Sequence, residues 1–187
     1  MVNSFDPQGS MLREAIVGSR RTSNYWWASA LLVGGLGFLL TSLSSKLGTN
    51  LLPFLSAQEI TFIPQGLVMG FYGGMALLIS LYLWLTILWN VGGGFNEFDQ
   101  QKGQVCIFRW GFPGKNRRIE FRAPLTDVEA IRIEIQEGVN PRRILYLRLK
   151  GRRELPLTRI GQPLTLAELE KQGAELAGFL QVPLEGL

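Results

Sequence analysis

The chain has 187 residues, a net charge of +4, no histidine and a single cysteine. Without histidine it has no imidazole to serve as a base or a metal ligand, and Cys106 alone cannot form an internal disulfide or a CxxC redox pair. We therefore expect no catalytic site, no metal site and no cofactor.

Two long stretches without charged residues dominate the first half of the chain. One lies between Arg21 and Lys46 and the other between Glu59 and Glu97. A helix needs about 20 mostly apolar residues to cross a bilayer, and it satisfies its own backbone polar groups there. We expect a transmembrane hairpin over residues 25–90, with spans at about 25–43 and 67–89, after an N-terminal tail of residues 1–24.

A cleaved signal peptide is the less favoured alternative for the first stretch. The stretch is longer than the usual apolar region of a signal peptide, and no A-x-A-like cleavage site follows it. The distribution of basic residues indicates the orientation of the hairpin. The connecting loop, residues 46–65, holds only one basic residue, whereas basic residues precede the first span and follow the second. By the positive-inside rule both tails face the cytoplasmic side, and the loop faces across the membrane.

Small residues recur at intervals of four in both spans. The second span carries Gly66, Gly70 and Gly74, and the first carries Ala30 and Gly34. Small residues let membrane helices approach closely. These positions either pack the two spans of this chain together or receive the transmembrane helix of a partner. Neither span holds a charged residue, so we do not expect a channel or a transporter.

Beyond residue 95 the pattern changes to apolar and charged residues in alternation, which is typical of half-buried strands. Short turns separate the alternating runs and favour antiparallel neighbours. We expect six strands, at residues 95–99, 104–110, 117–122, 128–136, 143–149 and 153–158.

A final helix is expected over residues 166–180. Thr165 and Glu168 form the sequence pattern of a capping box, and Pro183 ends the helix. The fold class is thus an α+β membrane protein, in which a soluble domain of residues 95–187 follows the hairpin. An antiparallel sheet or small barrel covered by one C-terminal helix resembles the pleckstrin-homology-like architecture, an analogy that implies no function.

Charged residues supply the candidate contact sites. The densest cationic cluster is Lys115, Arg117, Arg118 and Arg122, joined in sequence by Arg109. Arginine suits carboxylate or phosphate groups, and basic residues near a membrane are attracted to anionic lipids. Solvated strand faces are the plainer interpretation. Acidic residues interrupt the cluster, so we do not expect nucleic-acid binding.

The last helix has an acidic character from Glu168, Glu170 and Glu175. Capping explains Glu168 best, although a contact role stays open for it. Glu170 flanks the apolar stripe of the helix and Glu175 faces away from it, so both are available to meet a partner.

Several strings of residues together resemble one known family. They are Gly18-Ser-Arg-Arg-Thr-Ser-Asn-Tyr-Trp-Trp27, Phe95-Asn-Glu-Phe-Asp99, Phe108-Arg-Trp-Gly-Phe-Pro-Gly-Lys-Asn-Arg-Arg118, Pro156-Leu-Thr-Arg-Ile160, Glu170-Lys-Gln172 and Phe179-Leu-Gln-Val-Pro183. They resemble the photosystem I assembly protein family of thylakoid membranes, which cyanobacteria and chloroplast genomes encode as conserved reading frame four. The likeness runs essentially end to end, and we expect a member of the cyanobacterial type.

The resemblance implies a multi-pass protein of the thylakoid membrane, with both termini on the cytoplasmic (stromal) side and the loop in the lumen. It implies a non-enzymatic assembly factor that helps newly made photosystem I subunits come together. The implied partners are those subunits and the thylakoid lipid bilayer, and self-association is left open. The alternative from the residues is a membrane-anchored regulatory domain that binds anionic lipid.

Overall fold

The chain folds into two compact units. The helical unit comprises Gly18–Val91 and Gly111–Lys115, and the β unit comprises Met1–Val17, Gly92–Trp110 and Asn116–Leu187. The computed structural model describes residues 3–5, 10–51, 60–136, 142–151, 153–158 and 165–186. Residues 52–59 of the expected loop lie outside the described residues.

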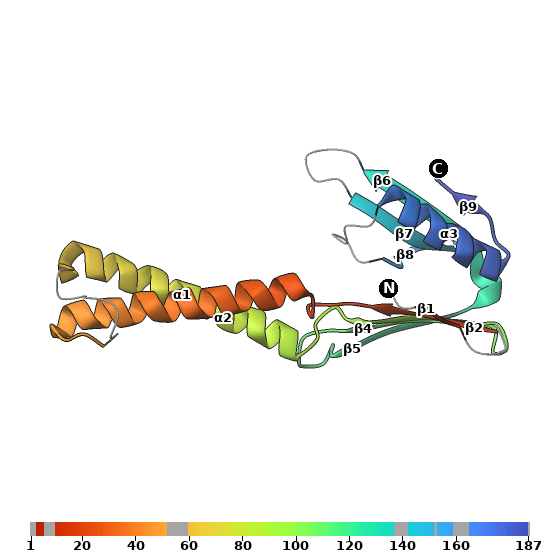
Figure 1. The fold of residues 1–187 in the computed structure, drawn as a ribbon. Coiled ribbons are helices and arrows are strands. Elements are labelled where there is room, and N and C mark those ends of the chain that lie inside the picture. Colours follow the sequence, from red (N-terminus) through yellow and green to blue (C-terminus); the bar gives the residue numbers. More distant parts are fainter. Residues whose placement is uncertain are drawn as a thin grey trace. The chain divides into compact units, whose positions relative to one another are not determined.

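The helical unit is a hairpin of two long helices (Figure 1). Helix α1 spans Thr22–Leu47, and the π-helical turn η2 (Phe62–Gly66) leads into α2 (Leu67–Leu88). Both are long and apolar enough to cross a membrane, which confirms the two apolar helices expected from the sequence. Their location in a membrane stays a prediction.

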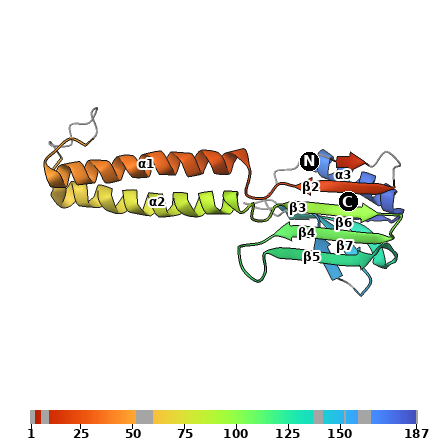
Figure 2. The same cartoon turned by 90° about the horizontal axis from the view of Figure 1, so that it is seen from below.

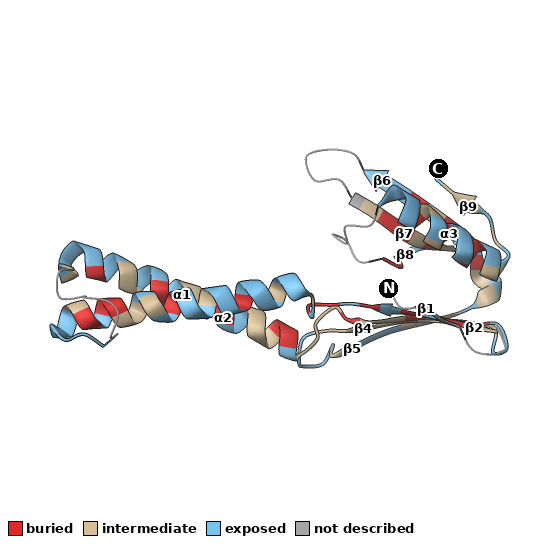
Figure 3. Ribbon diagram, viewed as in Figure 1, coloured by how far each residue is buried: buried red, intermediate tan, exposed pale blue. Residues whose placement is uncertain are grey.

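The surface of the hairpin is unusually apolar. Only 28% of the most apolar window of α1, and 22% of that around α2, is buried within the protein. Large side chains such as Trp26, Val33 and Phe71 are 63%, 72% and 65% exposed. In Figure 3 most of the ribbon of the hairpin is coloured exposed or intermediate, and buried residues appear only in short stretches. A core helix of a soluble protein would bury most of its apolar surface, whereas this hairpin leaves most of that surface exposed.

The first sheet of the β unit has five antiparallel strands in the order β1-β2-β3-β4-β5. Figure 2 shows its strands β2 to β5 side by side. Their bounds are Asn3–Phe5 for β1, Met11–Ile16 for β2, Gly94–Asp99 for β3, Gln104–Trp110 for β4 and Arg118–Pro124 for β5.

The second sheet has the order β8-β7-β6-β9 and carries the C-terminal helix. After a 3-10 turn, η3 (Leu125–Asp127), come β6 (Val128–Gln136), β7 (Arg142–Leu149), β8 (Arg153–Pro156), α3 (Leu166–Leu180) and β9 (Leu184–Glu185). Strands β6, β7 and β8 are antiparallel neighbours, whereas β9 pairs in parallel with β6.

The two sheets and α3 share one apolar core. Period-two alternation turns one face of each sheet inward, and its fully buried side chains include Phe98, Val105, Ile131, Leu147 and Leu176. Burial of such side chains stabilises the unit by about 1.5–3 kcal/mol each.

Helix α3 confirms the expected capping box. Thr165 accepts a hydrogen bond from the Glu168 backbone N–H, and the Glu168 carboxylate accepts one from the Thr165 N–H at 2.9 Å. Gly173 lies in the middle of the buried face of α3. A Cβ there would lie 3.1 Å from the Leu184 side chain and 3.2 Å from that of Leu145, so glycine lets α3 lie close to the second sheet.

Three strands differ from the sequence prediction, which assigned no strand to the tail of residues 1–24. Strands β1 and β2 lie within that tail, and β2 pairs along its whole length with β3. The third is β9. The prediction of antiparallel strands and a C-terminal helix is confirmed. The described strands form two sheets, and the pleckstrin-homology-like architecture stays a prediction.

Candidate partner-binding surfaces

The helices of the hairpin lie close together at Gly35 and Gly73. A Cβ on Gly73 would lie 2.9 Å from the carbonyl oxygen of Gly35, and one on Gly70 would lie 2.6 Å from Ser42 Oγ. Gly66 likewise lies against Ser45. By contrast, a Cβ on Gly34 or Gly74 would meet nothing within 4 Å. The small residues expected to act together are therefore divided between the seam of the hairpin and its open surface.

Hydrogen bonds of α2 with α1 and with the residues just before α1 fix the hairpin further. Ser80 Oγ donates to the Ala28 carbonyl at 2.8 Å, and Ser19 Oγ donates to the Thr86 carbonyl at 2.6 Å. Arg20 donates to the carbonyls of Ile87 and Leu88, which are among the last of α2. A cation there also suits the negative end of the helix dipole.

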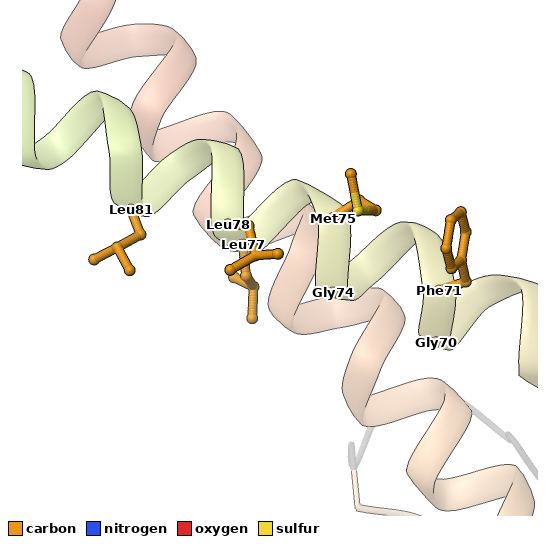
Figure 4. A pocket seen from close by; sticks show the side chains of 7 residues that line it. All are labelled: Gly70, Phe71, Gly74, Met75, Leu77, Leu78 and Leu81. Carbon is orange, nitrogen blue, oxygen red and sulfur yellow. The ribbon is translucent and has the colours of Figure 1, made fainter.

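Apolar grooves lie on the open surface of the hairpin. One, of about 520 Å³, lies along α2 and is shown in Figure 4; its lining residues are Gly70, Phe71, Gly74, Met75, Leu77, Leu78 and Leu81. A groove of about 320 Å³ includes Ala30, Gly34 and Tyr72 in its lining. Grooves without charged groups suit lipid chains or the side chains of another apolar helix.

The outer face of the first sheet carries a row of aromatic rings. Phe95 stacks on Phe108 with 5.3 Å between centroids, and Phe108 meets Trp110 edge-on at 4.9 Å. Arg117 and Arg118 lie over the Trp110 ring, at 5.1 and 5.7 Å from its centroid. Arginine beside aromatic rings is a composition enriched at the centres of protein interfaces.

The predicted cationic cluster is divided between the two units. Lys115 belongs to the helical unit, whereas Arg117, Arg118 and Arg122 belong to the β unit. Arg122 forms an ion pair with Glu120, and this pairing lowers the pKa of the Glu120 carboxyl.

Cys106 lies beside Glu120, with 3.6 Å between its Sγ and the carboxylate. Burial is the main cause of the raised pKa of its thiol, which disfavours the reactive thiolate.

Arg109 does not join the exposed cations, although it stands beside them in the sequence. Its side chain lies on the inner face of the first sheet. It donates to Asn96 Oδ1 at 2.7 Å and to the carbonyls of Leu157 and Phe95 at 3.1 and 3.0 Å. Since Leu157 follows β8, this guanidinium ties the first sheet to the end of the second.

Glu14 completes a buried polar network that the sequence did not reveal. It is only 4% exposed, and its carboxylate accepts a weak hydrogen bond from Asn96 Nδ2 at 3.4 Å. Burial is the main cause that raises the pKa of Glu14, and the charge of Glu175 adds to it. The Asn96 hydrogen bond and the charge of Arg109 act in the opposite direction.

The three acidic residues of α3 have different surroundings. Glu168 is occupied by the capping box, and Thr165 lowers the pKa of its carboxyl. Glu175 lies 3.9 Å from Lys171 Nζ. Glu170 is half-buried beside the apolar stripe. Within the described part of the chain, no group of three or more Cys, Asp or Glu side chains could hold a metal ion.

A model of one protein family, Ycf4, matches residues 9–178 of the chain. The chain belongs to the Ycf4 family. The family resemblance stated from the sequence strings is thereby confirmed. The match includes both the helical unit and most of the β unit.

Three relatives illustrate the extent of the likeness, and each is named "Photosystem I assembly protein Ycf4". The relative from Nephroselmis olivacea is 67% identical over 181 residues, which cover 97% of this chain and 99% of the relative. That from Mesostigma viride is 60% identical over the full length of both. That from the cyanobacterium Thermosynechococcus vestitus is 61% identical over 180 residues, 96% of this chain and 94% of the relative. Membership of the cyanobacterial type within the Ycf4 family stays a prediction.

Proposed function

We propose that this Ycf4 protein is a non-enzymatic assembly factor for photosystem I in the thylakoid membrane. The observation that carries the proposal is the end-to-end similarity to relatives named as photosystem I assembly proteins. The absence of histidine from the whole chain and the raised pKa of its one thiol are consistent with a protein that acts by binding.

The hairpin anchors the protein beside its partners. Its exposed apolar side chains would face lipid tails, and the grooves along α2 and α1 would receive helices of newly made subunits. Both termini and the β unit would lie on the cytoplasmic (stromal) side, with the loop of residues 46–65 in the lumen. Anchoring in one membrane raises the effective concentration of the β unit for those subunits without new contacts.

Charged side chains would make the weak, reversible contacts that an assembly factor needs. On the cationic side these are Arg117 and Arg118 first, then Lys115 and Arg122. On the acidic side they are Glu170 and Glu175, with Glu168 shared between capping and contact. Exposed charge pairs contribute little affinity each, so contacts built from them are readily reversed.

Deletion of the gene tests the function. Photosystem I should accumulate to a lower level per cell, as measured by immunoblot of its subunits, while photosystem II stays unchanged. Purification of the tagged protein in mild detergent should then recover newly made photosystem I polypeptides, identified by mass spectrometry. Normal photosystem I in the deletion strain, together with no such polypeptides, would refute the proposal.

A second candidate function is binding of anionic lipid, favoured by the two arginines over Trp110. Tryptophan beside cations is typical of the headgroup region of membranes. The protein reconstituted in nanodiscs would then bind added vesicles with anionic lipid and release them at high salt. Equal binding to neutral vesicles would exclude this function.

A further inference from the structure

Strand β5 offers a long free edge on the β unit. Among the described residues it ends the first sheet on one side, as Figure 2 shows. It has seven residues, whereas the other edge strands β1, β8 and β9 have three, four and two. An edge strand presents a row of N–H and C=O groups that can pair with another chain.

The ladder shows which backbone groups of β5 face outward. Leu125 N donates to the Gly103 carbonyl at 2.8 Å, next to the paired residues Pro124 and Gln104. Bonded and non-bonded pairs alternate along an antiparallel ladder. The residues of β5 that form backbone hydrogen bonds to β4 are therefore Ile119, Phe121 and Ala123. The residues that alternate with them are Arg118, Glu120 and Arg122, and their backbone groups point away from β4.

The position of Pro124 agrees with this phase. Pro124 occupies the same alternate positions as the outward-facing residues. Because it has no N–H, and an N–H there would not point toward β4, its presence removes no hydrogen bond between β4 and β5. On the other side of β4, Trp110 N donates to the Gly93 carbonyl at 2.7 Å. Trp110 thus bonds toward β3, as the alternation requires for the residue opposite Arg118.

The outward-facing residues also carry a distinct charge pattern. Arg118, Glu120 and Arg122 are exposed and alternate in sign along one face. On the opposite face, Ile119 is 54% exposed and Phe121 is half-buried. A strand added at this edge would cover these two apolar side chains and bring its own charges opposite the three charged ones.

We propose that the β5 edge binds an extended segment of a partner protein as an additional strand. The segment carries acidic residues opposite Arg118 and Arg122 and a basic residue opposite Glu120. Main-chain hydrogen bonds supply the affinity of such strand addition, and the charge pattern supplies the selectivity. The inference rests on the proposed function, because newly made subunits are the partners that would present unpaired segments.

The direct test uses the full-length protein in nanodiscs and two labelled nine-residue peptides. One has the central sequence Glu-Val-Lys-Val-Glu and the other the inverted sequence Lys-Val-Glu-Val-Lys. Fluorescence anisotropy should show the first bound at least about tenfold more tightly. Combined reversal by Arg118→Glu, Glu120→Lys and Arg122→Glu should reverse the preference, whereas the control Lys171→Glu on α3 should keep it. Equal binding of both peptides, or none, overturns the proposal.

A backbone test separates strand addition from simple charge attraction. Glu120→Pro removes an outward N–H without breaking a bond to β4, and Glu120→Ala removes the same side chain but keeps that N–H. We expect the alanine variant to bind the first peptide and the proline variant to lose it. Equal binding by the two variants overturns the proposal.

A second copy of this chain would also match in charge, with Glu120 opposite Arg122 of the copy. Dimers that dissociate in the proline variant alone would assign the edge to self-association and overturn the proposal. Cells that express the Glu120→Pro variant should accumulate less photosystem I than cells that express Glu120→Ala. If the two accumulate equally while the gene deletion lowers photosystem I, the inference fails and the proposed function stands.

Discussion

Gly35 and Gly73 lie face to face where α1 and α2 cross, so that a Cβ on either would come within 3.1 Å of the carbonyl oxygen of the other. A backbone oxygen cannot move aside as a flexible side chain can. The crossing therefore depends on the lack of a side chain at both positions.

Gly73→Leu should open the hairpin, because the new side chain meets backbone on α1. We expect a loss of about 1–3 kcal/mol in stability, which is the usual cost of overpacking. The midpoint of unfolding by sodium dodecyl sulfate, followed by circular dichroism, measures it.

Gly74→Leu is the matched control, since a Cβ there meets nothing within 4 Å. It should leave the unfolding midpoint unchanged. If the groove on α2 receives a partner helix, the same variant should lower photosystem I accumulation. A stable variant with normal photosystem I would show that the groove at Gly74 receives no partner helix that photosystem I accumulation requires.

The pattern of the sequence could not show this division of the glycines. Residues four apart form a stripe on a helix, but the stripe does not tell which part faces the neighbouring helix. Gly35 lies outside the predicted sets at Gly66, Gly70 and Gly74 and at Ala30 and Gly34, and Gly73 stands beside the first set without belonging to its four-residue spacing. Only the geometry of the contact between α1 and α2 shows that these two glycines lie at the seam of the hairpin.

In the β unit, strand β6 was predictable from its regular alternation, whereas strand β2 was not, because an inward polar residue interrupts its alternation. Strand β6 alternates aliphatic and polar residues, and its predicted bounds, 128–136, are those observed. In β2 the inward positions are Leu12, Glu14 and Ile16. The glutamate interrupts the alternation of apolar and polar residues by which a strand is predicted. Arg109 was grouped with the cationic cluster in the sequence for the same reason. Its side chain follows those of Val105 and Ile107 on the inner face of β4. Burial of these polar groups depends on partners from distant strands, which no local pattern encodes.

Arg109→Met should destabilise the β unit, because Asn96 Oδ1 loses its donor. The Leu157 carbonyl loses one of two donors and keeps that from Asn96 Nδ2. Leaving the Asn96 oxygen unsatisfied costs about 1–3 kcal/mol. The loss should appear in the thermal unfolding of the β-sheet signal by circular dichroism. Arg122→Met is the control, since it removes only an exposed ion pair and should change little. Equal effects of the two variants would contradict the buried role of Arg109.

Glu14 should make the stability of the β unit depend on pH. Because its pKa is raised in the folded state, the folded protein holds this proton more tightly than the unfolded chain does. Its contribution to stability is present below the ordinary pKa of 4.5 and is lost as the pH rises through the raised pKa. Wild type should therefore lose stability relative to Glu14→Gln from about pH 4.5 upward, and the difference should level off above the raised pKa.

The measurement for Glu14 is the difference in unfolding midpoint between wild type and Glu14→Gln across pH 4 to 8. Groups with lowered pKa, such as Asp99 and Glu168, lose their contribution as the pH falls, but they are common to both proteins and cancel in the difference. If wild type instead gains stability relative to Glu14→Gln as the pH rises, the carboxylate is stabilised in the fold by Arg109 and Asn96.

Charge reversal at Arg117 and Arg118 tests the arginines over Trp110 as a contact site. With glutamate at both positions, acidic groups on newly made subunits would be repelled and the cation–π contacts would be lost. We expect lower photosystem I accumulation, while immunoblots show this protein at its normal abundance. Arg132→Glu on the second sheet is a control, because Arg132 pairs with Glu154 away from the aromatic row. Normal photosystem I in the double variant would remove these two arginines from the contact site and leave the remaining surfaces to be tested.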